Sequence, residues 1–197
     1  MLAAHEEWKP AKPIAHPSLS EADAASLRAE RLARQAQSYK LKDPPKIALV
    51  RWTTMQDLGP TVASCLRAEG FNVIGYGSGL EYPDGISPAQ ASAYNLADFE
   101  CTSKYTMHPR FLLKWTADQW GVLYDYQVEW LTPCLKGRGF DVSAPPSRET
   151  YVGLAMQNVS SDWDPVAEVD LKVRTVEARR ELWTACPQYP RVEEMWG

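Results

Sequence analysis

The chain has 197 residues, of which 45% are hydrophobic and 23% charged, and its formal net charge is −4. These values are ordinary for a globular protein and argue against a largely disordered chain. They offer neither the clustered basic face that nucleic acids or anionic membrane surfaces need nor an apolar run long enough to span a membrane.

The first segment, 1–19, is rich in Pro and polar residues and predicts a flexible leader. It lacks the order of charged, apolar and small residues that marks a secretory signal. Three explanations stay open: a cytosolic protein, a signal already removed, or a start assigned too late. Residues 20–42 then predict a surface helix, which Ser20 begins and the Asp-Pro-Pro at 43–45 ends.

The segment "KIALVRW" at 46–52 is the strongest strand prediction, because β-branched and apolar residues follow a Pro pair. We expect this strand to be central in a small sheet. Gly59 and Pro60 then begin a short helix that leads to Cys65.

One phrase occurs twice, as "CLRAEGFNV" at 65–73 and "CLKGRGFDV" at 134–142. In each copy, Cys and Leu belong to the last turn of a helix, and a basic residue lies where the helix dipole favours a cation. The Gly ends the helix in the left-handed conformation, and Phe-x-Val alternates as a short extended segment. The phrase therefore predicts two related helix–extended–helix units, at about 54–105 and 117–190.

Each phrase is followed by a helical pattern that ends on a second cysteine. Four cysteines allow three pairings, and the repeat favours one bridge in each unit, Cys65–Cys101 and Cys134–Cys186. Four buried free thiols in a cytosolic protein are the alternative. A zinc site is disfavoured, because the chain has no C-x-x-C and its histidines are not spaced to complete a cluster: His5, His16 and His108.

Thr116 and Gln119 form a capping-box pattern that begins the clearest helix, about 117–138. One face of this helix is apolar or aromatic, although it also includes Gln127. Ser147 predicts the start of another helix, a last helix extends to Cys186, and the tail at 191–197 is expected to be loose. The fold prediction is a single α+β domain over 43–190, with two related units around a small sheet and two disulfides.

Three segments carry a resemblance: "YDYQVEWLTPCLKGRGFDVSAPPSRETYV", "LADFECTSKY" and "ACPQYP". Over residues 46–190 the chain resembles a family of uncharacterised actinobacterial cell-envelope proteins that are secreted or lipid-anchored. The resemblance implies an extracytoplasmic location and paired cysteines. It implies no established activity and no catalytic residues. The chain departs from such proteins in having no signal peptide and no lipid-accepting cysteine near its start.

Candidate catalytic groups are few. Asp125 and Glu129 are spaced i, i+4, so they share a helix face and are candidates for acid–base chemistry, with His108 as a third group. A solvated helix face is the more common explanation of such a carboxylate pair. The Gly-rich "GYGSG" at 75–79 predicts a turn, because no Lys-Ser/Thr follows it as in a phosphate loop. No metal site and no cofactor are predicted.

Aromatic residues gather in the middle of the chain, and surplus Trp and Tyr at a surface suit protein or glycan contacts. The candidate binding residues are Tyr124, Tyr126, Trp130 and Trp163, although the hydrophobic core is the commoner place for each. Asp162 and Asp164 flank Trp163 as a calcium or sugar contact, or simply as turn residues before Pro165.

These observations predict a non-catalytic extracytoplasmic binding protein whose partner is another protein or a cell-wall component. One alternative is an envelope hydrolase that cleaves glycans through Asp125 and Glu129. Another is a cytosolic or phage-encoded interaction protein with free thiols.

Overall fold

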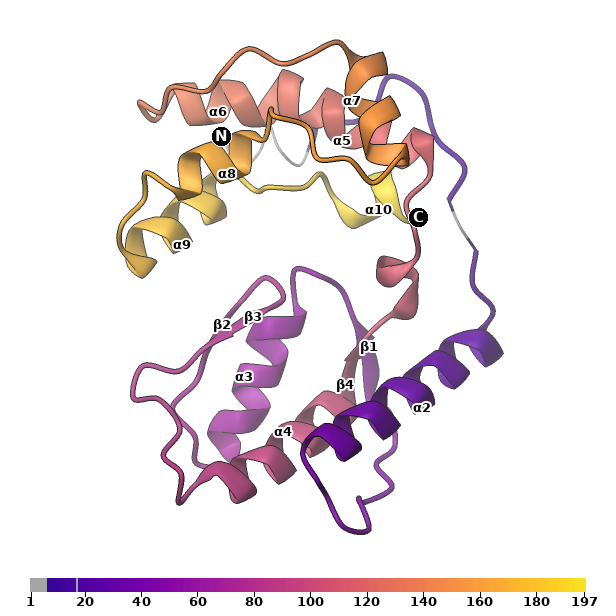
Figure 1. Cartoon of the computed structure of the whole chain (residues 1–197), viewed down its shortest axis with the longest axis vertical. Helices are drawn as coiled ribbons and strands as arrows, with labels where there is room; N and C mark the ends of the chain where they lie inside the picture. Colours follow the sequence, from indigo (N-terminus) through magenta and orange to yellow (C-terminus); the bar gives the residue numbers. More distant parts are fainter. Residues whose placement is uncertain (1–6, 17) are drawn as a thin grey trace. The chain divides into compact units, whose positions relative to one another are not determined.

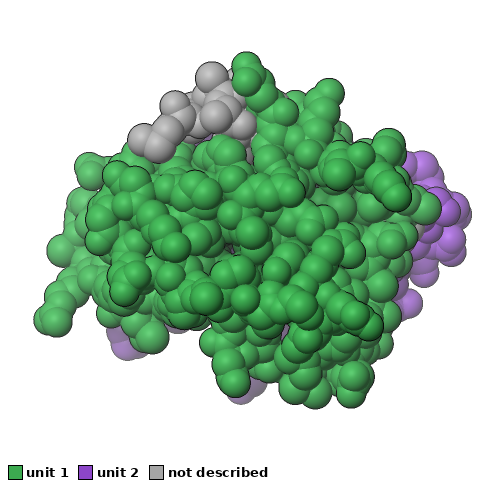
Figure 2. All heavy atoms as spheres, turned by 90° about the horizontal axis from the view of Figure 1, so that it is seen from above, with its two compact units in different colours: residues 1–16, 114–197 green, residues 17–113 purple. Residues whose placement is uncertain are grey.

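The computed structural model describes residues 7–16 and 18–197. The chain divides into two compact units: unit 1 comprises residues 1–16 and 114–197, and unit 2 comprises residues 17–113 (Figure 2). Each unit contains one copy of the repeated phrase. The division after Leu113 differs from the prediction of one domain over 43–190.

The predicted fold class is confirmed, since the chain is 51% helix and only 6% strand, with two disulfides. Both of its small sheets lie in unit 2, and unit 1 has no strand among its described residues.

Unit 2 begins with helix α2 (Glu21–Ser38), close to the prediction. The Ser20 side chain accepts a hydrogen bond from the Asp23 N–H, so it satisfies one of the free donors at the helix start. Ala24 and Ala36 are its buried residues, and most of its other side chains are exposed.

The prediction of a strand at 46–52 holds only for Arg51 and Trp52, and the strand is not central. Strand β1 is only Arg51–Thr53, and it pairs in parallel with β4 (Tyr105–Met107) in a two-stranded sheet. The helix before β4 continues to Lys104, so residues 46–50 have no neighbouring strand. Arg28 of α2 instead donates a hydrogen bond to the Ile47 carbonyl at 3.0 Å, and this segment lies beside α2.

The rest of unit 2 packs around helix α3 (Leu58–Ala68), with helix α4 (Ala91–Lys104) and the hairpin of β2 (Ile74–Tyr76) and β3 (Gly79–Glu81) beside it (Figure 1). The segment 75–79 forms the tip of this hairpin, as its composition predicts. A Cβ on Gly75 would lie 2.0 Å from the Gly59 carbonyl oxygen. The hairpin can therefore pack against the start of α3 only because residue 75 is glycine. A short 3₁₀ helix, η1 (Pro109–Leu112), ends the unit.

The first helix of unit 1 is continuous but not uniform. It consists of α5 (Ala117–Tyr126), the π-helical turn η2 (Gln127–Leu131) and α6 (Thr132–Lys136), placed end to end (Figure 1). The predicted capping box is present at its start. Pro133 explains the π turn, because a proline ring clashes with the carbonyl four residues earlier in an ordinary α-helix.

The other helices of unit 1 are α7 (Arg148–Met156), α8 (Pro165–Asp170), α9 (Val176–Ala185) and α10 (Val192–Met195). The tail predicted to be loose at 191–197 is instead part of the unit. Met195 is fully buried, Trp196 is 3% exposed, and Gln119 Nε2 donates to the Met195 carbonyl at 2.9 Å. Two large apolar side chains at the end of the chain therefore help to close this core.

The predicted flexible leader is also partly attached. Trp8 packs edge-on against Tyr126, with ring centroids 5.1 Å apart, and its indole N–H donates to Glu129 at 3.0 Å. Residues 1–6, which include His5, and residue 17 lie outside the described residues.

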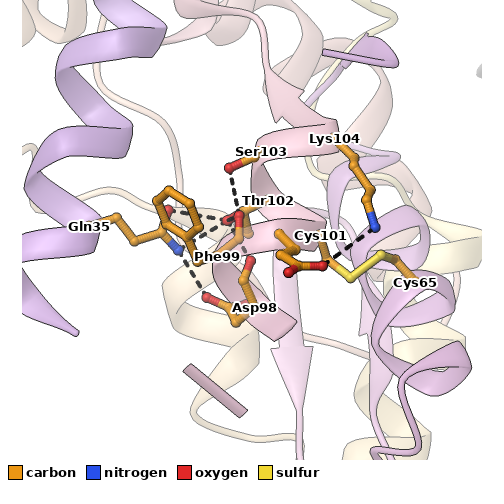
Figure 3. The surroundings of a disulfide bond; sticks show 9 residues. Gln35, Cys65, Asp98, Phe99, Cys101, Thr102, Ser103 and Lys104 are labelled. Carbon is orange, nitrogen blue, oxygen red and sulfur yellow. Dashed lines mark hydrogen bonds and ion pairs between the residues drawn. A yellow bond between two sulfur atoms is a disulfide. The ribbon is translucent and has the colours of Figure 1, made fainter. Parts of the chain in front are cut away.

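Both predicted disulfides are present, Cys65–Cys101 and Cys134–Cys186, with Cα atoms 5.7 and 5.9 Å apart (the first is drawn in Figure 3). The helices before them end in the same way. Gly70 and Gly139 have φ of 91° and 84°, and the N–H of the following Phe donates to a Leu carbonyl at 3.1 Å in both copies. This is the Schellman arrangement, so the repeated phrase encodes the same local structure twice.

Candidate functional site

The predicted acid–base residues all have other partners. Arg148 Nε donates to both oxygens of Asp125, at 2.9 and 3.1 Å, and Glu129 accepts the bond from Trp8. His108 belongs to unit 2, where its Nδ1 accepts a hydrogen bond from the Arg110 N–H at the start of η1. Burial, and then the charge of Arg110, lowers the pKa of His108. The structure therefore gives each of these groups a local structural role.

Three of the four predicted binding aromatics are structural. Tyr126 is fully buried, and its hydroxyl donates to the Pro187 carbonyl at 2.7 Å. Trp130 stacks on Tyr126 at 5.3 Å, with the two rings 15° from parallel. The Tyr124 hydroxyl donates to the Pro146 carbonyl at 2.6 Å. Trp163 lines a cavity in unit 1 to which the other three do not contribute.

This cavity, here called the aromatic cavity, has a volume of about 410 Å³ and lies entirely within unit 1. Its walls come from Trp115, α5, the first residue of η2, α7, the segment 158–166 and residues 188–189. Five aromatic side chains line it: Trp115, Trp120, Tyr151, Trp163 and Tyr189. Its polar lining is almost uncharged: Gln127, Asn158, Ser160, Ser161, Gln188 and the single acid Asp164.

The five rings contact one another in a continuous series. The centroid distances are 6.2 Å for Tyr189–Trp115, 4.6 Å for Trp115–Trp120, 6.3 Å for Trp120–Tyr151 and 5.9 Å for Tyr151–Trp163. The Trp163 indole N–H also donates to the Ser143 carbonyl at 3.1 Å. Edge-on and tilted ring pairs at these distances stabilise each other, so the aromatic wall is held in place without a ligand.

Gln127, the first residue of the π turn, is the most informative polar group of the cavity. Its side chain is 5% exposed, and its Oε1 accepts a hydrogen bond from the Tyr151 hydroxyl at 3.3 Å. Its Nε2 has no hydrogen-bond partner among the described residues. This Nε2 is not among the fully buried, unpaired side-chain atoms of the described residues, so water reaches it, and a ligand acceptor at this position would take the place of that water. π turns are also frequent at functional sites.

Asp164 acts first as a helix cap. Its Oδ1 accepts hydrogen bonds from the N–H groups of Val166 and Ala167, at 2.9 and 3.0 Å, at the start of α8. This supports the turn interpretation of the Asp pair around Trp163. Burial, with a smaller contribution from the Asp164 charge, raises the pKa of Tyr151 to about 12. The tyrosines of the cavity are therefore neutral hydroxyls at physiological pH.

Most residues of this site were not among the binding residues predicted from the sequence: Trp115, Trp120, Gln127, Tyr151 and Tyr189. One signal was available, because Gln127 is a polar amide on the otherwise apolar face of the clearest helix. The rings themselves come from segments up to about seventy residues apart, and only the packing of unit 1 brings them together.

Comparison with models of known protein families, with curated proteins and with solved structures gave no match. Within residues 7–16 and 18–197, no helix is long and apolar enough to cross a membrane. The same residues contain no group of His, Cys, Asp and Glu that could hold a metal ion.

Proposed function

We propose that the protein is a non-catalytic, extracytoplasmic binding protein of a bacterial cell envelope, and that the aromatic cavity of unit 1 receives its ligand. The observation that carries this proposal is the cavity itself. It has five aromatic side chains already packed against each other, and the amide donor of Gln127, which lines it, has no hydrogen-bond partner among the described residues. Cavities of this size that combine apolar walls with a few polar groups are typical ligand sites.

The two disulfides support the proposed location, because such bridges persist in oxidising compartments and are rare in the cytosol. The resemblance to actinobacterial envelope proteins, secreted or lipid-anchored, belongs to the same proposal.

A cell-wall component suits the cavity better than the flat surface of another protein, because the cavity is concave and small. The glycan hydrolase has less support. Its two carboxylates are bonded to Arg148 and Trp8, and neither lines the cavity. We therefore propose binding without catalysis.

The test is co-sedimentation of the oxidised protein with insoluble cell-wall sacculi prepared from an actinobacterium. Trp120→Ala removes one ring from the centre of the aromatic wall, and Trp120→Phe keeps a smaller ring in case the first variant does not fold. Leu171→Ala is the matched control, because Leu171 is 88% exposed and does not line the cavity. We expect the wild type and the control to sediment with sacculi, and the Trp120 variants to bind at least tenfold more weakly. Sedimentation that is absent, or equal in all four proteins, would contradict the proposal.

A further inference from the structure

The charge of the aromatic cavity argues against an anionic ligand. Among the residues that the structure describes, no Lys or Arg lines the cavity, and the one carboxylate there, Asp164, would repel a phosphate or a carboxylate. The N-terminus of α8 offers no anion site either, because the Asp164 carboxylate already accepts from its N–H groups.

The unpaired polar groups argue against a cation. Besides Gln127 Nε2, the indole N–H groups of Trp115 and Trp120 have no hydrogen-bond partner in the part of the chain that the structure describes. A quaternary ammonium ion suits a set of aromatic faces, but it brings no acceptor for these three donors. They would remain unpaired once the ligand had displaced water, which is costly for a buried donor.

The remaining lining groups both donate and accept. Asn158, Gln188 and the two serines offer amide or hydroxyl oxygens, and Asp164 Oδ2 takes no hydrogen bond from any described residue. A ligand rich in hydroxyl groups matches this mixture, because each hydroxyl donates one hydrogen bond and accepts others. A lipid chain would leave all of these groups unpaired.

We infer that the ligand of the aromatic cavity is an uncharged oligosaccharide, whose sugar rings lie against Trp115 and Trp120 while an acceptor oxygen binds Gln127 Nε2. This inference rests on the proposed binding function and specifies its ligand class. A sugar ring has an apolar C–H face for an aromatic wall and a rim of hydroxyls for the polar groups. The volume of about 410 Å³ lies within the range of roughly 300–1,000 Å³ that holds drug-sized ligands, which suits more than one sugar ring.

The experiment is a competition against sacculi binding, followed by direct titration. Sacculi are digested with glycan-cleaving enzymes, and the soluble products are separated into neutral, acidic and basic fractions. Each fraction, together with cellotriose, the trimer of N-acetylglucosamine, choline and a proline-rich decapeptide, is titrated against tryptophan fluorescence. We expect saturable binding of the neutral fraction or of a neutral trisaccharide, with a change in indole emission, because two indoles lie at the proposed contact.

Gln127→Met is the decisive variant. It keeps the length of the side chain and removes the N–H donor, so we expect affinity for the neutral saccharide to fall roughly tenfold. Leu171→Ala should leave this affinity unchanged. Equal affinity of wild type and Gln127→Met for the saccharide would overturn the assignment of Gln127 as a saccharide donor.

The outcomes separate the two proposals. Suppose that sacculi binding depends on Trp120, but that only the charged fractions, choline or the proline-rich peptide displace it. This result overturns the saccharide inference and leaves the proposed binding function intact. Failure to sediment with sacculi, together with no response to any probe, overturns both.

Discussion

Unit 1 and unit 2 contain the same phrase, the same Schellman helix end and one disulfide each, yet they use a buried polar side chain in opposite ways. In unit 2 that side chain is Asp98, which is 5% exposed and accepts hydrogen bonds from the Tyr39 hydroxyl at 2.6 Å and from Gln35 Nε2 at 3.0 Å (Figure 3 shows the latter). In unit 1 it is Gln127, whose amide donor has no partner in the described part of the chain and lies beside an aromatic wall.

The difference follows from what lies outside the repeated phrase. After Val73, unit 2 turns into the β2–β3 hairpin, which packs on α3, and α2 with its C-cap Tyr39 supplies the partners of Asp98. After Val142, unit 1 continues through a Pro-containing loop to α7, which supplies Tyr151 to the cavity. The phrase and the bridge therefore form a frame, and the residues added to that frame decide whether the buried polar side chain is paired.

Removal of a disulfide should have the largest effect on stability, and the loss of stability should be similar in the two units. The bridges close loops with sequence separations of 36 and 52 residues, for which chain entropy predicts a loss of about 4 kcal/mol each. We expect the double variants Cys65→Ser/Cys101→Ser and Cys134→Ser/Cys186→Ser each to destabilise the unit that contains the altered pair. Urea unfolding followed by hydrogen exchange of each unit measures this. If both double variants destabilise the same unit, the two bridges are not equivalent and this comparison of the units is wrong.

Substitution of the glycine in each copy of the repeated phrase tests whether the two helix ends are equivalent. Gly70 and Gly139 have positive φ, and a Cβ at either position would meet no atom within 4 Å, so only backbone strain opposes a side chain. We expect Gly70→Ala and Gly139→Ala each to cost about 1–2 kcal/mol of stability.

Gly153→Ala is the control for these variants. Gly153 lies inside α7 with open space around its Cα, so alanine there should stabilise by up to about 1 kcal/mol. Denaturant midpoints compare the three variants. Equal midpoints for Gly70→Ala and wild type would show that this helix end does not need the left-handed conformation.

The smallest effect is expected from the Asp98 cluster, and it depends on pH. Burial, and then the hydrogen bond to Asp98, raises the pKa of Tyr39 to about 12 from its usual 10.0. A raised pKa means that the folded state holds the proton more tightly than the unfolded state. The stabilisation is therefore fully present below pH 10 and is lost as the pH rises from 10 to 12.

Tyr39→Phe should remove the Tyr39 contribution to this alkaline loss and cost about 1 kcal/mol at neutral pH, because one hydrogen bond to a buried carboxylate is missing. Denaturant unfolding at a series of alkaline pH values measures both quantities. Tyr151→Phe is the counterpart in unit 1, since burial raises the pKa of Tyr151 to about 12 as well. An unchanged alkaline slope in Tyr39→Phe would contradict the role given to this hydroxyl.

Local signals in the sequence predicted local structure well. The capping box at Thr116, the N-cap at Ser20, the glycine helix ends and the cysteine pairs all involve residues whose partners lie close by or repeat along the chain. The prediction of a strand at 46–52 was wrong over most of its length. Composition shows that a segment can be extended, but not that a second strand will lie beside it. The prediction of a loose tail at 191–197 was wrong for a related reason, because the burial of Trp196 depends on a core assembled from distant helices.

The candidate site was the least predictable part. Of the four aromatics selected as binding residues, the structure places Trp163 in the cavity, while Tyr126 and Trp130 build the core. Whether a given ring faces a core or a cavity depends on the π turn before Pro133 and on the packing of α7, and neither can be derived from periodicity alone.

The order of the two bridges along the chain has a consequence for how the protein is made. Each bridge joins consecutive cysteines, and each closes within one compact unit. In the exported protein that we propose, a chain that leaves a translocation pore with its N-terminus first presents Cys65 and Cys101 to an oxidant before Cys134 has appeared. Simple sequential oxidation then gives the native pairs, and under this proposal biogenesis should require an oxidase but no disulfide isomerase.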